Sequence, residues 1–88
     1  MPYIKLEQRA IWDRMADGVC KLLTMHEVED RDGQLNYFIT KILKAAYPPK
    51  YFNYNRAIGV LECIKQEFYR RDVSKYEDKK IRENGDVL

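Results

Sequence analysis

Apolar positions recur at helical spacing along most of this 88-residue chain. Residues at i, i+3, i+4 and i+7 lie on one face of an α-helix. Three segments follow this rule and predict helices over residues 4–28, 33–47 and 53–72, with further helix to residue 83. Short connections favour antiparallel neighbours. The predicted fold class is therefore all-α: a small antiparallel helical bundle of three main helices with a helical C-terminal extension.

The first predicted helix is followed by the acidic segment EVEDRDG at residues 27–33. Its apolar stripe consists of Ile4, Ile11, Met15, Val19, Leu22 and Leu23. We expect residues 27–33 to form a short loop that supplies Asp30 or Asp32 as the N-cap of the next helix, because a carboxylate accepts hydrogen bonds from free backbone N–H groups. The spacing does not fit a twelve-residue calcium loop, so no metal site is expected there.

The second and third predicted helices carry the most regular stripes, and both stripes are predicted to be core. They consist of Leu35, Phe38, Ile39, Ile42, Leu43 and Ala46, and of Tyr54, Ala57, Ile58, Leu61, Ile64 and Phe68. Pro48 should end the second helix at Tyr47, because the residue before a proline is disfavoured in the α region. Asn53 is the predicted N-cap of the third helix. Gly59 lies just off the stripe, where it either lets another helix come close or is simply tolerated.

The apolar pattern weakens after Phe68, and charged residues dominate the tail. The third helix either continues to residue 83 or folds back at Ser74 as a short fourth helix, and Asn84-Gly85 is a fitting stop signal. We expect residues 1–72 to form the helical bundle domain and residues 73–88 a polar C-terminal helical extension.

Composition indicates a soluble globular protein, with 45% hydrophobic and 34% charged residues. No apolar run approaches the roughly 18 residues that span a bilayer, so a cytoplasmic protein is expected. Cys20 and Cys63 lie within apolar helical patterns and without a CxxC motif, which favours reduced, partly buried thiols over a disulfide. Small domains without disulfides or metals often gain stability by association, so a homo-oligomer is expected.

Net positive charge is concentrated in the middle of the chain. Residues 33–61 carry four basic and no acidic side chains, although the net charge is only +2, which disfavours direct nucleic-acid binding. Aromatic and basic residues crowd the turn around the prolines, and two arginines lie downstream, where another chain could contribute them. Rings stack on bases, basic groups pair with phosphate, and helix N-termini bind anions. The leading hypothesis is therefore a site for a nucleotide-like or other anionic ligand, although the same residues also suit half-buried packing at helix ends. The predicted ligand-binding residues are Tyr47, Lys50, Tyr51, Tyr54, Asn55, Arg56, Arg70 and Arg71.

No catalytic residue or cofactor is predicted. His26 is the single histidine, and no nucleophile, zinc-protease, P-loop or dinucleotide motif occurs, so the protein is expected not to be an enzyme. The competing hypothesis is a protein–protein interaction module that presents its C-terminal helix, with Tyr69, Tyr76 and Ile81, to a host or virion protein.

The segments GQLNYFITKILKAAY, GVLECIKQEFYRR and YEDKKIRENGDVL resemble an uncharacterised family of small bacterial and phage proteins with EFYRR and YEDxKIxENGDV motifs. The resemblance covers about residues 33–88 and departs at Leu88, where a tyrosine is expected. It implies a phage-associated accessory protein in the host cytoplasm. Such proteins commonly bind a host protein or sequester a small signalling molecule.

Overall fold

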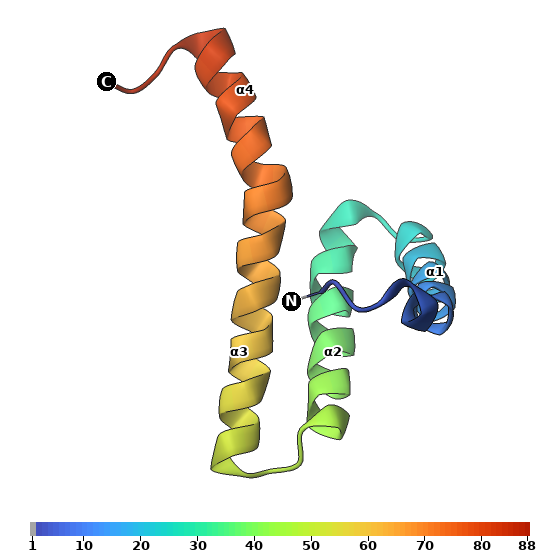
Figure 1. Ribbon diagram of the computed structural model, residues 1–88. Helices are drawn as coiled ribbons and strands as arrows, with labels where there is room; N and C mark the ends of the chain where they lie inside the picture. The colour runs from blue at the N-terminus through green and yellow to red at the C-terminus, as the bar shows by residue number, and fades with distance from the viewer. Residues whose placement is uncertain (1) are drawn as a thin grey trace.

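The structure, a computed structural model, describes residues 2–88 and confirms the all-α fold class (Figure 1). Every regular element within those residues is helical. The elements are a 3₁₀ turn η1 (Leu6–Gln8), α1 (Arg9–Thr24), α2 (Val28–Ala46), α3 (Tyr51–Phe68), a π-helical turn η2 (Tyr69–Val73) and α4 (Ser74–Asn84).

Helices α2 and α3 lie side by side and antiparallel around the Pro48-Pro49 turn (Figure 1). Tyr47 has an extended backbone, with φ −124° and ψ 93°, so α2 ends where the prolines require it to end. The predicted N-cap Asn53 was wrong, because the N-cap is Lys50. Asn53 lies inside the first turn of α3, and its Nδ2 donates to the Pro48 carbonyl oxygen at 2.9 Å, which closes the turn.

The boundary between α1 and α2 also differs from the prediction. Helix α1 ends at Thr24 rather than near residue 28, and the segment predicted to be an acidic loop forms the first turns of α2. The N-cap is Glu27, not Asp30 or Asp32. Acidic residues in a first turn complement the positive end of the helix dipole, so the acidic segment favours a helix start rather than a loop.

The C-terminal third is one continuous helix of 34 residues, from Tyr51 to Asn84. The alternative in which the chain folds back at Ser74 was therefore wrong. Phe68 and Val73 are five residues apart, a spacing that an α-helix would place on different faces. The π turn η2 takes up the extra residue, and Ser74 N–H bonds to the Tyr69 carbonyl oxygen across it. The helix ends at Gly85, whose φ of +87° suits glycine.

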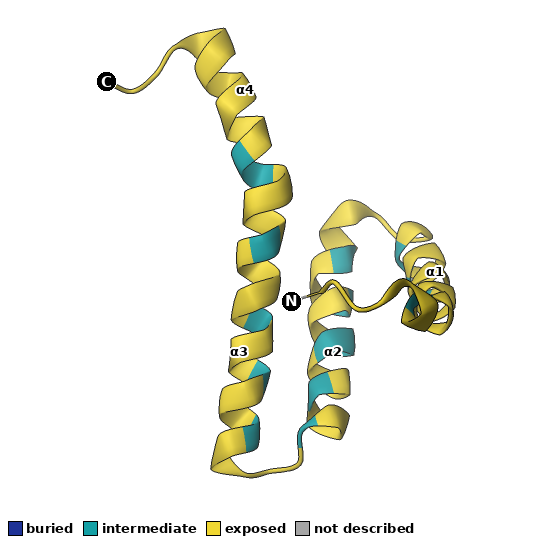
Figure 2. Ribbon diagram, viewed as in Figure 1, coloured by how far each residue is buried: buried dark blue, intermediate teal, exposed yellow. Residues whose placement is uncertain are grey.

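The predicted core is not a core within one chain. No residue from 2 to 88 is buried (Figure 2). Half-buried side chains follow the facing sides of α2 and α3, including Leu43, Ala57 and Leu61, but other members of the predicted stripes are open. Ile64 and Phe68 keep 54% and 63% of their surface exposed. The helical periodicity was correct, but it identifies surfaces that one copy of the chain does not cover.

Helix α1 contributes little to closing this surface. Its C-terminal half contacts α2, where Val19 and Leu23 are half-buried, whereas neither α1 nor α2 packs closely along the length of α3. In Figure 1 it is viewed nearly along its axis, pointing away from the α2–α3 pair. Ile11 on its apolar stripe is 59% exposed, so the first turns of α1 have no partner helix among residues 2–88.

The radius of gyration and the accessible surface area also show that the chain is not compact. The radius of gyration is 16.7 Å, whereas a compact chain of this length has about 12 Å. The accessible surface is 8322 Å², whereas a compact monomer of this mass exposes about 5,500 Å². The excess is therefore about 2,800 Å² by that scaling. None of the described helices combines the length and apolar character that crossing a bilayer requires.

Candidate functional site

Residues 2–5, which we call the N-terminal strap, run back to α3 (Figure 1). Tyr3 donates its hydroxyl hydrogen to Glu67 Oε1, and Arg70 Nη2 lies 2.6 Å from the same oxygen. These hydrogen bonds, that from Tyr3 first, hold the pKa of Glu67 below its ordinary value, and the bond to Glu67 raises the pKa of Tyr3. The strap is therefore joined to the C-terminal part of α3 through the Glu67 carboxylate.

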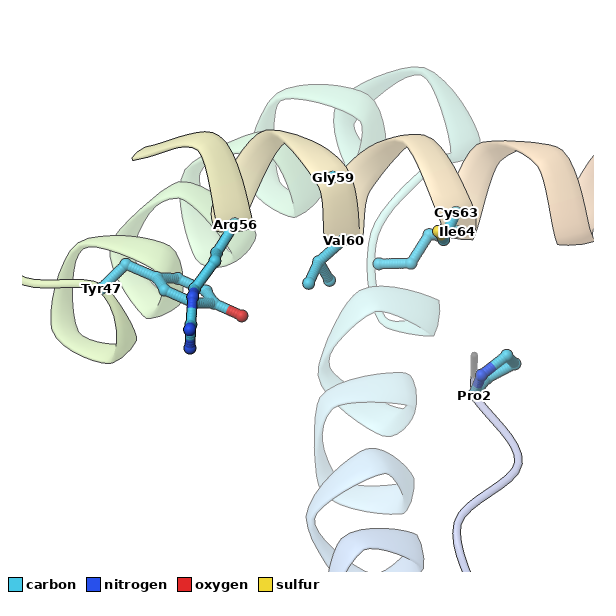
Figure 3. A pocket seen from close by; sticks show the side chains of 7 residues that line it. All are labelled: Pro2, Tyr47, Arg56, Gly59, Val60, Cys63 and Ile64. Atoms are coloured by element: carbon cyan, nitrogen blue, oxygen red, sulfur yellow. The ribbon is translucent and has the colours of Figure 1, made fainter. Parts of the chain in front are cut away.

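A hollow of about 640 Å³, which we call the α3 hollow, lies beside α3 between the end of α2 and the strap (Figure 3). Val60 and Ile64 point into it from α3, with Arg56 and Tyr47 at one end and Pro2 at the other. The residues that line it are Pro2, Tyr47, Arg56, Gly59, Val60, Cys63 and Ile64. The hollow is thus an open, mostly apolar trough with one cationic end.

The trough continues along α3. A smaller hollow of about 210 Å³ shares Pro2 and Cys63 with the α3 hollow and adds Gln66, Glu67 and Arg70. One face of α3 therefore runs from the cation Arg56, over apolar side chains, to the anion Glu67.

The predicted ligand-binding residues do not meet in one place. Tyr47 separates two hollows: Arg56 lines the α3 hollow, whereas Tyr54 lines another of about 310 Å³ on the α2 side. Consecutive helical residues point in directions about 100° apart, which explains this separation. Lys50, Tyr51 and Asn55 line neither hollow.

The two downstream arginines lie far from the turn. Fourteen residues separate Arg56 from Arg70, which corresponds to about 21 Å along a helix. Arg70 is paired with Glu67, and Arg71 forms no ion pair with any residue from 2 to 88. A single chain therefore brings together only Tyr47 and Arg56 from the predicted set at the α3 hollow.

The predicted partner-binding residues lie along the continuous C-terminal helix. Tyr69 donates its hydroxyl hydrogen to Glu77 Oε1 at 2.8 Å, and this bond raises the pKa of Tyr69. The Lys80 ammonium lies 5.5 Å from the centre of the Tyr76 ring, within cation–π range. Tyr76 and Ile81 are exposed, on a helix that projects past the rest of the chain (Figure 1).

Groups that could perform chemistry are dispersed. No three His, Cys, Asp or Glu side chains among residues 2–88 converge as metal ligands. His26 lines a separate hollow of about 550 Å³ between α1 and α2, whose described lining contains no carboxylate or thiol. Cys20 and Cys63 are free thiols and are exposed rather than partly buried as predicted, because the stripes around them are not covered.

Sequence reasoning missed the contribution of the N-terminus to this site. Tyr3 contacts Glu67 of α3 across 64 positions of chain, and Pro2 lines the same hollow as α3. No local sequence pattern predicts this proximity. Gly59 lines the α3 hollow, but beyond its own helix backbone no atom of residues 2–88 lies within 4 Å of a Cβ built on it, so it did not signal the N-terminal contribution.

Comparisons with known proteins give a family without an assigned activity. No curated protein and no solved structure matches the chain. One family model, described as "Domain of unknown function (DUF6899)", matches residues 1–87 and so extends beyond the resemblance at residues 33–88. The resemblance to an uncharacterised family is confirmed at that level, while its motifs and its bacterial or phage origin stay predictions. The chain belongs to this family of unknown function.

Proposed function

We propose that this chain is a non-enzymatic protein-interaction module that works as an oligomer of itself. The observation that carries the proposal is the apolar surface of α3, which extends around several sides of the helix while only one side is turned toward α2. A helix that is apolar on more than one side is normally enclosed by other helices. Contiguous exposed apolar surface on a soluble protein marks interaction sites. Protein contacts therefore account for this surface better than chemistry does.

The C-terminal helix offers the surface for a different protein. Tyr69, Tyr76 and Ile81 lie on or beside the part that projects past α2, and aromatic residues are enriched at interface centres. The partner class is a host or virion protein, and the place of action is the cytoplasm, that of the host if the chain is phage-encoded. The resemblance to bacterial and phage accessory proteins supports this part of the proposal.

Two measurements test the proposal. Native mass spectrometry of the purified protein should give a multiple of the 10.6 kDa chain mass without a stoichiometric small molecule. Affinity capture from the source cells should then enrich one defined protein. The variant Tyr76→Ser/Ile81→Ser should lose that protein with circular dichroism unchanged, whereas the matched control Lys75→Ser/Asp78→Ser should retain it. A single-chain mass together with no selectively retained protein would refute the proposal.

A second candidate function is binding of a nucleotide-like or other anionic ligand in the α3 hollow. The specific observation in its favour is Arg56, which faces the hollow beside Tyr47 and pairs with no carboxylate among residues 2–88 (Figure 3). Calorimetric titration with nucleotides and cyclic nucleotides should then show binding that Arg56→Gln weakens at least tenfold and Lys50→Gln leaves unchanged. Affinities no tighter than high micromolar would exclude this candidate.

A further inference from the structure

The exposed face of α3 in the trough has a palindromic pattern. Arg56, Val60, Cys63 and Glu67 follow one another at i, i+4, i+7 and i+11, so they lie on one helix face. All four line the two connected hollows beside the strap. Reversing the direction of the helix exchanges Arg56 with Glu67 and Val60 with Cys63. A cation is thereby exchanged with an anion, and one medium-sized apolar residue with another.

We infer that this face of α3 is the contact between two copies of the chain, which pack α3 against α3 in antiparallel orientation about a two-fold axis between Leu61 and Glu62. A two-fold contact requires a self-complementary patch, in which residue i of one copy meets residue j of its partner and j meets i. In this pairing Val60 packs against Cys63 of the second copy, and Arg56 reaches its Glu67. This inference rests on the proposed oligomer and adds which face joins the copies.

Charge supports a second copy as the occupant of the trough. Arg56 forms no ion pair or side-chain hydrogen bond among residues 2–88. Glu67 uses Oε1 for both Tyr3 and Arg70, and its Oε2 takes part in no side-chain hydrogen bond or ion pair among residues 2–88. Each copy thus supplies one unused cation and one unused acceptor at mirrored positions, and the antiparallel pair satisfies both twice.

The exposed area also fits. A standard stable interface buries about 800 Å² per partner, and obligate homodimers bury more. The chain exposes about 2,800 Å² beyond a compact monomer of its mass. One α3–α3 contact therefore draws on only part of this excess. The remaining apolar surface, on the other side of α3 and on α1, stays available for the partner contacts proposed above.

Gly59 lies at the edge of the contact face. A Cβ built on it meets nothing within 4 Å, so packing within one chain does not require glycine there. Glycine inside a helix is disfavoured by about 1 kcal/mol relative to alanine. Close approach of a second α3 would explain why glycine occupies this position, which packing within the single chain does not explain.

The test is a disulfide between two distinguishable chains. Both chains carry Cys20→Ser. The first, which is tagged, also carries Val60→Cys and Cys63→Ser, and the second retains Cys63 as its only thiol. Residues opposite each other in closely packed helices come within the Cα separation that a disulfide bridges. Mild oxidation should therefore give a tagged–untagged dimer in high yield. The matched control replaces Val60→Cys with Lys65→Cys, on the opposite face of α3, and should give little dimer.

Sedimentation equilibrium of the unaltered chain provides the second readout, with twice the 10.6 kDa chain mass expected. The rate of Cys63 modification should rise on dilution as the dimer dissociates. A single-chain mass at all concentrations would overturn both the inference and the proposed oligomer. An oligomer that links as well through Lys65→Cys as through Val60→Cys would overturn the α3–α3 pairing while leaving the oligomer standing. Saturation of the trough by a small anion without self-association would likewise contradict the pairing.

Discussion

Reversing the charge of Arg56 is the sharpest perturbation of the proposed dimer. In the antiparallel pair, Arg56 of each copy meets Glu67 of the other, so Arg56→Glu converts two attractions into two repulsions. An exposed ion pair contributes about 0.2–1 kcal/mol. Inverting two such pairs weakens association by about 2 kcal/mol, which corresponds to a roughly thirtyfold rise in the dimer Kd. The isolated chain should keep its helix content, because Arg56 forms no ion pair or side-chain hydrogen bond with residues 2–88.

Sedimentation equilibrium at low ionic strength measures this change. Lys65→Glu makes the same change in net charge on the opposite face of α3 and should leave the Kd within about threefold of the unaltered chain. The difference between the two variants should shrink at 1 M salt, where the Debye length falls to about 3 Å. Adding Glu67→Gln to Arg56→Glu should recover part of the loss, since the amide oxygen still accepts from Tyr3 while the repulsion disappears. Equal Kd values for Arg56→Glu and Lys65→Glu would refute the α3–α3 pairing.

Four further predictions follow from local geometry. Gly59→Ala in the Arg56→Glu background should stabilise the helix by about 1 kcal/mol, because the added Cβ meets nothing within 4 Å. Circular dichroism measures this change, and a loss of helicity would contradict the prediction. Tyr3→Phe should raise the pKa of the Glu67 carboxyl in an NMR titration, whereas Tyr76→Phe should not. The contact lowers the pKa of Glu67 and raises that of Tyr3. Docking of the strap on α3 should therefore be lost as pH falls through the Glu67 pKa, and also as pH rises through the Tyr3 pKa. Docking that stays constant through both pH ranges would contradict the contact. Gly85→Ala places a side chain at φ +87°, costs about 1–3 kcal/mol locally and should accelerate amide exchange in the last turn of α4; unchanged exchange would contradict the assigned helix end.

Helix ends were predictable where a single residue restricts or frees the backbone. The end of α2 at Tyr47 follows from the proline after it, and the stop at Gly85 follows from the tolerance of glycine for positive φ. The predicted start of α2 was wrong because the acidic residues were assigned to a loop. Negative side chains are equally favourable in the first turn of a helix, where they interact with the positive end of the helix dipole. The predicted cap Asn53 was wrong because α3 begins at Tyr51, which places Asn53 inside the first turn.

The candidate site was less predictable, because proximity along the sequence differs from proximity in space. Tyr54, Asn55 and Arg56 are consecutive, yet the helix sends them in three directions, and only Arg56 joins Tyr47 in the α3 hollow. The Tyr3–Glu67 contact joins residues 64 positions apart, which no local period encodes.

The sequence by itself determined that the chain is helical, where its proline turn lies, and which side chains share a face, because these depend on backbone sterics and on the 3.6-residue period. Only the tertiary structure decided whether the apolar faces meet one another. It leaves them open, with no buried residue from 2 to 88. The physical reason is that periodicity specifies the face that must leave water, but not the surface that covers it. That covering depends on the directions in which short turns send the helices, and here those directions leave most of the apolar surface of α3 exposed.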